Sequence, residues 1–386
     1  MTHIVHLTPY YAPAYAFGGV VRAVEGLVRT LAGRGHRVTV LTTDAHDLAR
    51  HGVDPADERI DGVRVLRAPN AIYPLRRVNL STPRGLARLA ADVLAAADVL
   101  HVHEFRTTEN LIVLPQAVRQ GVPIVLSPHG TLATATGRGA LKRAWDRLLS
   151  PRMMRQIAAA VGVHAEGAAG ADARWPAAGP SPRTAPNAHG IDPAPYAALD
   201  GAAFRARWGL GDAVVCLFLG RLHARKGVEA LARAFQQVAG PHVRLVIAGP
   251  DEGMLPTLHS LAAADPRIVL TGFLDGDARL GALAAADLFA LPATGEGLSM
   301  AMLEAMAAGL PLLIAPGCHF PQAQSAGAGV IVPPEVEPLA AALRDLLADP
   351  ARRQAMGAAA RRLAVEHYAW DSIAAQWESV YAELGD

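Results

Sequence analysis

The chain has 386 residues, of which 51% are hydrophobic and 18% are charged, and its formal net charge is +1. This composition is typical of a globular protein, and the length is sufficient for two domains with separate cores. The chain is nearly neutral and only 5% of its residues are aromatic. These values argue against nucleic acid as a partner, because nucleic-acid binding relies on basic surface and on aromatic stacking.

The cysteines and the apolar segments indicate the cellular compartment in which the protein works. Cys216 and Cys318 lack metal-ligand spacing, so we expect neither a disulfide framework nor a zinc site. The chain enters a strand at Ile4 without a signal-type start, and charges interrupt its Ala-rich segments, such as residues 86–100. We therefore expect a cytoplasmic protein that is soluble or peripherally bound to the inner face of the cytoplasmic membrane.

In the first half of the chain, short β-branched runs alternate with longer segments in which Ala and Leu recur at helical spacing. Such an alternation predicts an α/β fold with a parallel sheet flanked by helices, and ligands bind to such a sheet beyond the carboxyl ends of its strands. We expect strands near 3–8, 37–43, 63–67, 98–103, 123–127 and 159–163, and helices near 20–34, 84–97, 108–120 and 139–156.

The loop after the first strand contains two adjacent glycines, Gly18 and Gly19, directly before a helix. Glycines at this place let the backbone approach a ligand closely, and they leave the first helix N–H groups facing a phosphate. A plain Gly-Gly turn explains the same pattern equally well.

Histidines occupy two later strand ends. His101 and His103 alternate along one strand, so their side chains share one face. No third ligand is apparent in the sequence, and we expect packed histidines there and no metal site. His129 follows the strand near 123–127, and a histidine in that position can donate or relay a proton near neutral pH.

A basic segment and a linker end the first half. Residues 138–155 interleave cations with Trp145 and several leucines, which is typical of an amphipathic helix that docks on an anionic membrane surface. A solvated helix face explains the charges equally well. Residues 165–195 are rich in Ala, Gly and Pro, as in a passage between two domains. The cations of the basic segment are Arg138, Lys142, Arg143, Arg147, Arg152 and Arg155.

The second half repeats the alternation, beginning with a strand at 213–219. Arg221 and Lys226 follow that strand and precede a helix, where two cations can converge on phosphate oxygens. Scattered surface cations are the plainer explanation of the same residues.

The strand expected at 268–270 leads into the loop Thr271-Gly272-Phe273-Leu274. The next residues, Asp275-Gly276-Asp277, have the Asp-x-Asp pattern of some metal sites. A helix follows them directly, which favours a capping role for Asp275 and no metal.

The most informative stretch runs from Ala293 to Gly309. An apolar strand at 288–292 ends in proline, and Ser299 precedes a helix in the position of an N-cap. Glu296 lies in the loop, and Glu304 lies about five residues into the helix. The amides of Gly297, Leu298 and Ser299 present the positive end of the helix dipole between the two carboxylates. The alternative is that Glu296 and Glu304 are ordinary surface glutamates without a binding role.

Three features of this stretch resemble the donor-site signature of the retaining glycosyltransferases of family 4. They are Gly-Glu-Gly-Leu-Ser before a helix, Glu304 eight positions after Glu296, and Ala-Met-Ala-Ala-Gly-Leu-Pro after it. The His129-Gly130 pair and the terminal helix after Tyr368 resemble the same family. So does Pro186-Asn187-Ala188-His189-Gly190-Ile191-Asp192, although Ala188-His189 before the glycine departs from the family pattern.

The resemblance implies the GT-B architecture, in which two Rossmann-like domains face a cleft. It makes residues 1–190 the acceptor-binding domain and residues 191–369 the nucleotide-sugar-binding domain, with residues 370–386 crossing back to the first domain. It also implies a role for each candidate residue. In the first domain, the loop of Gly18 and Gly19 faces the donor diphosphate and the acceptor, and His129 lies beside the transferred sugar. In the second domain, Arg221 and Lys226 bind the diphosphate and steady the leaving group, and the loop of Gly272, Phe273 and Leu274 surrounds the base. Glu296 and the amides of Gly297, Leu298 and Ser299 hold the sugar, and Glu304 binds the ribose.

We therefore expect retaining transfer of a sugar from a nucleotide diphosphate sugar to a hydroxyl acceptor, with His129, Arg221, Lys226 and Glu296 as catalytic residues. No metal or other cofactor is expected, and no carboxylate is evident as a covalent nucleophile. The basic segment 138–155 favours a lipid-linked glycan as the acceptor, as in cell-surface polysaccharide biosynthesis. Two alternatives share the donor site: a nucleotide-sugar 2-epimerase of the same architecture and a sugar-nucleotide-binding protein without catalysis.

Overall fold

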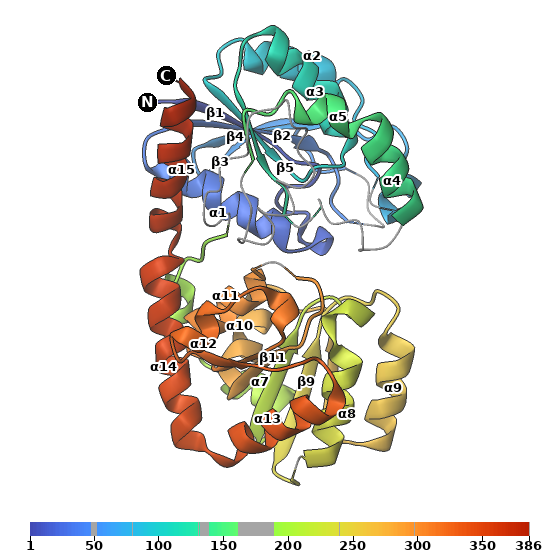
Figure 1. The fold of residues 1–386 in the computed structure, drawn as a ribbon, viewed down its shortest axis with the longest axis vertical. Helices are drawn as coiled ribbons and strands as arrows, with labels where there is room; N and C mark the ends of the chain where they lie inside the picture. Colours follow the sequence, from blue (N-terminus) through green and yellow to red (C-terminus); the bar gives the residue numbers. More distant parts are fainter. Residues whose placement is uncertain are drawn as a thin grey trace. The chain divides into compact units, whose positions relative to one another are not determined.

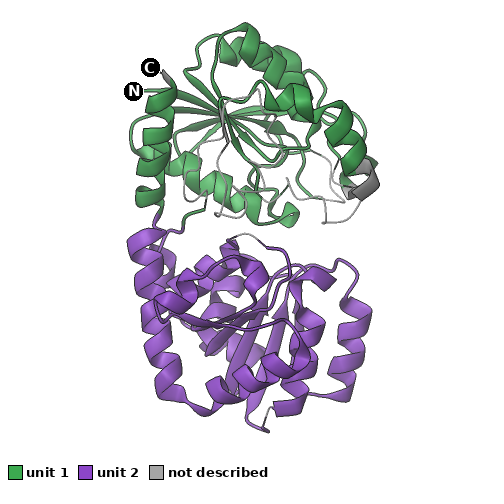
Figure 2. Cartoon of the chain, viewed as in Figure 1, with its two compact units in different colours: residues 1–190, 370–386 green, residues 191–369 purple. Residues whose placement is uncertain are grey.

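A computed structural model describes residues 1–47, 52–78, 80–129, 131, 139–160, 189–238, 240–296 and 298–385. The chain forms two compact units, which Figure 2 shows in different colours. Unit 1 comprises Met1–Gly190 and Trp370–Asp386, and unit 2 comprises Ile191–Ala369. Most of the expected linker at 165–195 lies outside the described residues.

Unit 1 contains a seven-stranded sheet with the strand order β3-β4-β2-β1-β5-β6-β7. All neighbouring strands are parallel except β3 and β4, which are antiparallel. The predicted parallel sheet is confirmed, and β3 is an additional edge strand whose charged sequence DERI gave no strand signal. The strands are β1 (His3–Leu7), β2 (Arg37–Thr43), β3 (Asp57–Ile60), β4 (Val63–Ala68), β5 (Val99–His103), β6 (Ile124–Ser127) and β7 (Ala159–Ala160).

The helices of unit 1 cover this sheet (Figure 1). The predicted continuous helix over 139–156 was wrong, because the chain is broken at Leu149 into two helices. Pro151 explains the break: it lacks an N–H group and its ring clashes with the preceding turn, so it is tolerated only at a helix start. The helices are α1 (Gly19–Gly33), α2 (Leu86–Leu94), α3 (Thr108–Arg119), α4 (Gly139–Leu148), α5 (Ser150–Met154) and α15 (Trp370–Gly385), with short turns η1 (Tyr15–Phe17) and η2 (Tyr73–Val78).

Helix α15 returns from unit 2 and packs on α1 of unit 1 (Figure 1). A Cβ atom at Gly26 would lie 2.2 Å from the indole of Trp370, so only glycine allows α1 and α15 to approach this closely. Arg34 binds Glu378 through two hydrogen bonds of 2.8 and 2.7 Å, and the Tyr381 hydroxyl lies 2.7 Å from Nδ1 of His101. The expected return of the C-terminal helix to the first domain is confirmed.

Unit 2 contains a six-stranded parallel sheet with the order β10-β9-β8-β11-β12-β13. The first three strands are added in one direction and the last three in the other, so the order reverses between β8 and β11. Ligands of open parallel sheets bind at such a switch point. The strands are β8 (Val214–Leu219), β9 (Val243–Ala248), β10 (Ile268–Gly272), β11 (Leu288–Leu291), β12 (Leu312–Ile314) and β13 (Gly329–Ile331).

Helix α11, which follows the switch-point strand β11, is buried at all eight of its residues. It is apolar on every side except at Glu304. A buried carboxylate in an apolar helix is unusual, because charged side chains are rarely buried without a partner. Cys216 and Cys318 are buried and free, as expected. The helices are α7 (Ala202–Arg207), α8 (Val228–Val238), α9 (Leu255–Ala264), α10 (Gly276–Ala285), α11 (Met300–Ala307), α12 (Gln322–Ser325), α13 (Val336–Ala348) and α14 (Pro350–His367), with short turns η3 (Ala194–Tyr196), η4 (Ala224–Lys226) and η5 (Pro316–Cys318).

Candidate functional site

The two loops that follow β8 and β11 are hydrogen-bonded to each other at the switch point of unit 2. The amide of Thr294 donates to the carbonyl of Arg225 at 2.8 Å, and Nη1 of Arg225 donates to the carbonyl of Gly295 at 3.3 Å. Gly227 has a φ of +69°, and a Cβ there would lie 2.1 Å from the carbonyl oxygen of Pro292. Glycine is therefore required for the two loops to meet.

This contact brings Lys226 and Glu296 together as an ion pair between Nζ and Oε2. Burial, assisted by the charge of Arg221, lowers the pKa of Lys226 to about 7. The carboxylate of Glu296 acts in the opposite direction, because an adjacent negative charge favours the protonated amine. Two of the residues selected from the sequence thus share one site, where the protonated amine of Lys226 is paired with the carboxylate of Glu296.

Arg221 lies on the same loop and faces Glu252. Its Nη1 donates to both carboxylate oxygens of Glu252, at 2.7 and 3.0 Å, and 42% of its side chain is exposed. Arg225 adds a third cation to the loop, and burial and the charge of Arg221 lower its pKa. The sequence analysis did not select Arg225, although its place directly before Lys226 was a usable signal. Three cations on one loop are an arrangement that can bind a polyanion.

Glu304 is paired with Arg279 of α10. The Nε of Arg279 donates to Oε2 of Glu304 at 2.8 Å, and its Nη2 donates to the same oxygen. Both side chains are largely buried. The sequence analysis missed Arg279, because nothing in the local pattern indicates that α10 and α11 bring these two residues together.

The loop Gly272-Phe273-Leu274 follows β10 and projects an aromatic ring. Gly272 has a φ of +76°, Leu274 is buried, and Phe273 is 49% exposed. Asp275 then begins α10 as its N-cap, with its side chain accepting from the amide of Gly276 at 2.9 Å. The capping role expected for Asp275 is confirmed. An exposed phenyl ring at a strand end can stack on a planar ligand.

The start of α11 differs from the expectation in one respect. Ser299 occupies the N-cap position with an extended backbone, but its side chain makes no capping hydrogen bond. Leu298 is buried, and Gly297 lies outside the described residues. The role predicted for the amides at this helix start stays a prediction.

In unit 1, Gly18 and Gly19 stand at the start of α1, as predicted. Gly18 is the N-cap with a φ of +112°, which L side chains rarely adopt, and Gly19 is the first helical residue. A Cβ at Gly18 would meet no described atom within 4 Å. Glycine is therefore needed at position 18 for its backbone angle, and this backbone is open to a ligand.

His129 has its ring between two other histidines. Its Nε2 lies 2.9 Å from Nδ1 of His103, and its Nδ1 lies 3.0 Å from Nε2 of His189. Burial lowers the pKa of His129 well below its usual range, and His189 acts in the same direction. His129 also has a φ of +46°, so its backbone is held in a conformation that is uncommon for a residue with a side chain.

His101 and His103 have a third histidine beside them, which was not apparent in the sequence. His6 lies on β1, which pairs with β5, and one nitrogen of each of the three histidines lies within 4.8 Å of the others. Five of their six ring nitrogens already have hydrogen-bond partners, namely His103, His6, His129, Tyr381 and Ser127. An ion bound by all three would displace at least two of these bonds, so the hydrogen-bond network explains the cluster without a metal.

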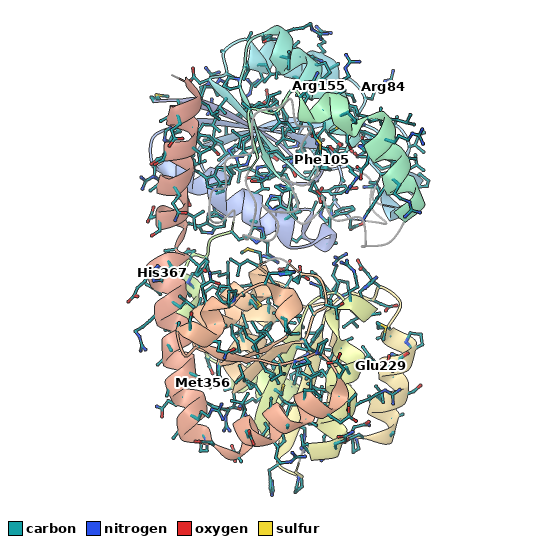
Figure 3. The ribbon with its side chains drawn as sticks, viewed as in Figure 1. Arg84, Phe105, Arg155, Glu229, Met356 and His367 are labelled. Carbon is teal, nitrogen blue, oxygen red and sulfur yellow. The ribbon has the colours of Figure 1, made fainter. Side chains whose placement is uncertain are left out.

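The basic segment forms α4 and α5, and its apolar side is mostly used within unit 1. Trp145 packs against the core of unit 1, and Met153 and Met154 belong to that core. Leu148 is 74% exposed, and Figure 3 shows Arg155 at the end of α5. Arg138 and the side chain of Leu141 are not described. The exposed cations are Arg143, Arg147, Arg152 and Arg155.

Known proteins resemble both halves of the chain. The profile of "Glycosyltransferase Family 4" matches residues 17–169, and that of "Glycosyl transferases group 1" matches residues 213–349. Glycogen synthase of Mycobacterium tuberculosis is 29% identical, over 96% of this chain and 92% of its own length. A GDP-mannose-dependent monoacylated alpha-(1-6)-phosphatidylinositol monomannoside mannosyltransferase of Corynebacterium glutamicum is 34% identical, over 45% of this chain and 48% of its own length.

Solved structures share the fold over the whole chain. The Anabaena protein HepE in complex with UDP-glucose has a TM-score of 0.76 at 18% identity and covers 99% of this chain and 100% of its own. Sucrose-phosphate synthase from Thermosynechococcus elongatus has the same TM-score at 21% identity, covering 100% and 99%. The expected fold class, GT-B with two Rossmann-like domains, is confirmed.

Proposed function

We propose that this chain, which belongs to the glycosyltransferases of family 4 and group 1, transfers a sugar from a nucleotide diphosphate sugar to a hydroxyl group of an acceptor. The observation that carries the proposal is the group of charged residues at the switch point of unit 2. The loop after β8 supplies the cations that a diphosphate needs, and Glu296 and Glu304 supply acceptors for the hydroxyl groups of a sugar and a ribose. Family membership supplies the reaction class, and these residues supply the donor class.

The diphosphate binds to the loop after β8. A phosphate oxygen about 4 Å from one cation gains roughly 4 kcal/mol at an effective dielectric constant near 20, before desolvation. The gain is smaller beside Arg221, whose side chain is 42% exposed, and larger beside the buried Lys226. These cations also stabilise the charge that develops on the leaving nucleoside diphosphate.

The sugar and the nucleoside lie on either side of the diphosphate. Glu296 accepts hydrogen bonds from the sugar hydroxyls, and Glu304 accepts from the ribose. The exposed ring of Phe273 stacks on the base, since a flat partly exposed phenyl group at the end of β10 suits a planar partner. This arrangement is supported by the pairing of Glu296 with Lys226 and by the burial of Glu304 in α11.

The transfer proceeds with retention by attack on the face from which the diphosphate leaves. The acceptor oxygen forms a bond to the anomeric carbon as the bond to the phosphate oxygen breaks, and the acceptor proton passes to that phosphate oxygen. A covalent sugar–enzyme intermediate is not part of the proposal, because Glu296 is engaged by Lys226 and is therefore a poor nucleophile. No metal or other cofactor takes part, since the cations of unit 2 occupy the role that a divalent ion has at a diphosphate.

Unit 1 binds the acceptor, with His129 beside the transferred sugar and with Gly18 and Gly19 near the diphosphate. The acceptor is a lipid-linked glycan used in cell-surface polysaccharide biosynthesis, and the exposed cations of α4 and α5 attach the enzyme to the cytoplasmic face of an anionic membrane. Within the described ranges no helix combines the length and the apolarity that crossing a membrane needs.

A thermal-shift screen of UDP, GDP, ADP and their sugars tests the donor class. A ligand at one hundred times its Kd stabilises the folded state by about 2.7 kcal/mol, so the true donor raises Tm clearly above the others. NMR of the product formed with an acceptor then gives the anomeric configuration, and retention is expected. Conversion of the donor in the absence of acceptor would instead identify an epimerase, and no stabilisation by any nucleotide would contradict the donor site.

A further inference from the structure

Four histidines of unit 1 form one continuous chain of hydrogen bonds. Nδ1 of His6 lies 2.9 Å from Nε2 of His103, whose Nδ1 lies 2.9 Å from Nε2 of His129. The Nδ1 of His129 lies 3.0 Å from Nε2 of His189. Neighbouring rings are inclined by only 13°, 24° and 17°. The chain therefore leads from the core of the sheet to the last residues of unit 1 before unit 2.

The buried end of the chain decides which nitrogens carry protons. The Nε2 of His6 is buried and has no hydrogen-bond partner among the residues that the structure describes. A neutral imidazole has one N–H group and one lone pair, so all links in a chain of neutral rings must point the same way. One direction leaves a lone pair unsatisfied at His6, and the other leaves a buried N–H group unsatisfied, which is the rarer situation in proteins. The first direction, with the proton on Nδ1 of every ring, is therefore favoured.

The rings are neutral because they are buried. Burial lowers the pKa of His6 to about 3, and it holds the pKa values of His103 and His129 well below their usual range. In the favoured direction His129 donates from Nδ1 to His189 and accepts at Nε2 from His103. Both of its nitrogens are then occupied, so the ring is fixed in one orientation and one tautomer.

We propose that His189 is a positioning residue of the transferase, which acts by holding the ring of His129 in this single tautomer. His189 stands where the sequence departs from the linker pattern of the family, and the hydrogen bond to His129 gives this departure a role. The effect on turnover rests on the proposed function, in which His129 lies beside the transferred sugar. The hydrogen-bond chain itself does not depend on that function.

Nuclear magnetic resonance of the intact protein labelled with ¹⁵N in histidine tests the chain directly, because protonated and unprotonated ring nitrogens differ widely in chemical shift. We expect His6, His103 and His129 to carry the proton on Nδ1 at neutral pH. The variant His189→Phe keeps an aromatic ring but has no acceptor, so the signals of His129 should change in it. Nε2–H tautomers in the wild type, or unchanged His129 signals in His189→Phe, would overturn the proposal.

Kinetics then test the consequence for the reaction. We expect His189→Phe to lower kcat at least about tenfold while KM for the donor changes less than about twofold, since an orientation held for the transition state affects kcat. His189→Gln should recover most of the activity, because its amide oxygen accepts from Nδ1 of His129. Equal losses in both variants, in step with a lowered Tm, would reduce His189 to a structural residue.

A matched control and the two separate readouts keep the outcomes distinct. His367→Gln alters an exposed histidine of α14, labelled in Figure 3, and should leave kcat unchanged. If the histidines have the expected tautomers but the protein has no transferase activity, the chain of hydrogen bonds stands and the proposed function is rejected. Expected activity with the opposite tautomers would retain the function and reject the tautomer assigned to His129.

Discussion

Arg279 and Glu304 meet at a single oxygen: both Nε and Nη2 of Arg279 donate to Oε2 of Glu304. Both hydrogen bonds leave Oε1 of Glu304 as the oxygen that would accept from a ribose hydroxyl in the proposed function. The guanidinium thereby orients a carboxylate that lies 25 positions later in the sequence.

We predict that Arg279→Gln and Glu304→Gln each weaken binding of the nucleoside diphosphate roughly tenfold, or about 1.4 kcal/mol. The double variant should lose less than the sum, because both changes remove the same interaction. Isothermal titration calorimetry measures the three values. Arg233→Gln, which removes an exposed pair with Glu229, should bind like the wild type (Figure 3 labels Glu229). Additive losses would show that the two residues act separately.

The low pKa of Lys226 predicts a pH dependence of donor affinity. Its pKa of about 7 in the free protein means that the amine loses its proton as the pH rises above 7. Binding of a nucleotide sugar favours the protonated amine, so affinity is highest below pH 7 and falls by up to about tenfold per pH unit above it. The phosphates of a nucleotide sugar do not titrate in this range. Lys226→Arg should flatten the profile between pH 6.5 and 9, and a flat profile in the wild type would refute the prediction.

Removal of a charge from the switch point of unit 2 should reduce turnover without unfolding the protein. We expect Arg221→Ala, Lys226→Ala and Glu296→Gln each to lower kcat at least about tenfold, which corresponds to ~1.4 kcal/mol of barrier. Circular dichroism and Tm verify the fold of each variant. If Glu296→Gln turns over a verified donor as fast as the wild type, the assignment of Glu296 to the site is wrong.

Activity should persist in a chelator. The cations of the loop after β8 are expected to take the role of a metal, and among the described residues the histidine cluster of His6, His101 and His103 already has partners for five of its six nitrogens. An assay with and without EDTA checks this. Complete loss in EDTA, reversed only by manganese or magnesium, would show that a metal site had been overlooked.

Liposome flotation tests the membrane proposal. Each exposed cation of α4 and α5 contributes up to about 1 kcal/mol of attraction to an anionic surface, so we expect binding to anionic vesicles at low salt and little binding to neutral ones. A variant that combines Arg143→Glu, Arg147→Glu, Arg152→Glu and Arg155→Glu should not bind, whereas Arg233→Glu should bind like the wild type. Failure of the wild type to bind either vesicle would remove the membrane claim and leave the transferase claim intact.

Local patterns in the sequence predicted the fold well. The apolar strands are bounded by glycine, proline and polar residues, so most predicted strands agree with the observed ones to within a residue or two, as for residues 37–43 and β2. The edge strand β3 was missed because a half-exposed strand does not need apolar residues. The amphipathic segment was predicted as one helix, since its helical period hid the effect of Pro151.

Pairs between distant residues could not be predicted in the same way. His6 meets His103 only because β1 lies next to β5 in the sheet, and Arg279 meets Glu304 only because two helices pack together. A hydrophobic pattern does not specify such neighbours. The apolar stripe around Trp145 was visible in the sequence, but its partner was not. The pattern is the same whether the stripe faces a membrane or, as found, the core of its own unit.

The place of α15 in unit 1 has a practical consequence for dissecting the protein. A fragment of residues 1–190 lacks α15, so it loses Tyr381 as the partner of His101 and uncovers the side of α1 on which Trp370 packs. Residues 191–369 form unit 2 without interruption, so a fragment with these bounds keeps the whole unit. For unit 1, a circular permutant is the appropriate fragment: it starts at residue 370, joins residue 386 to Met1 through a flexible linker, and ends at residue 190.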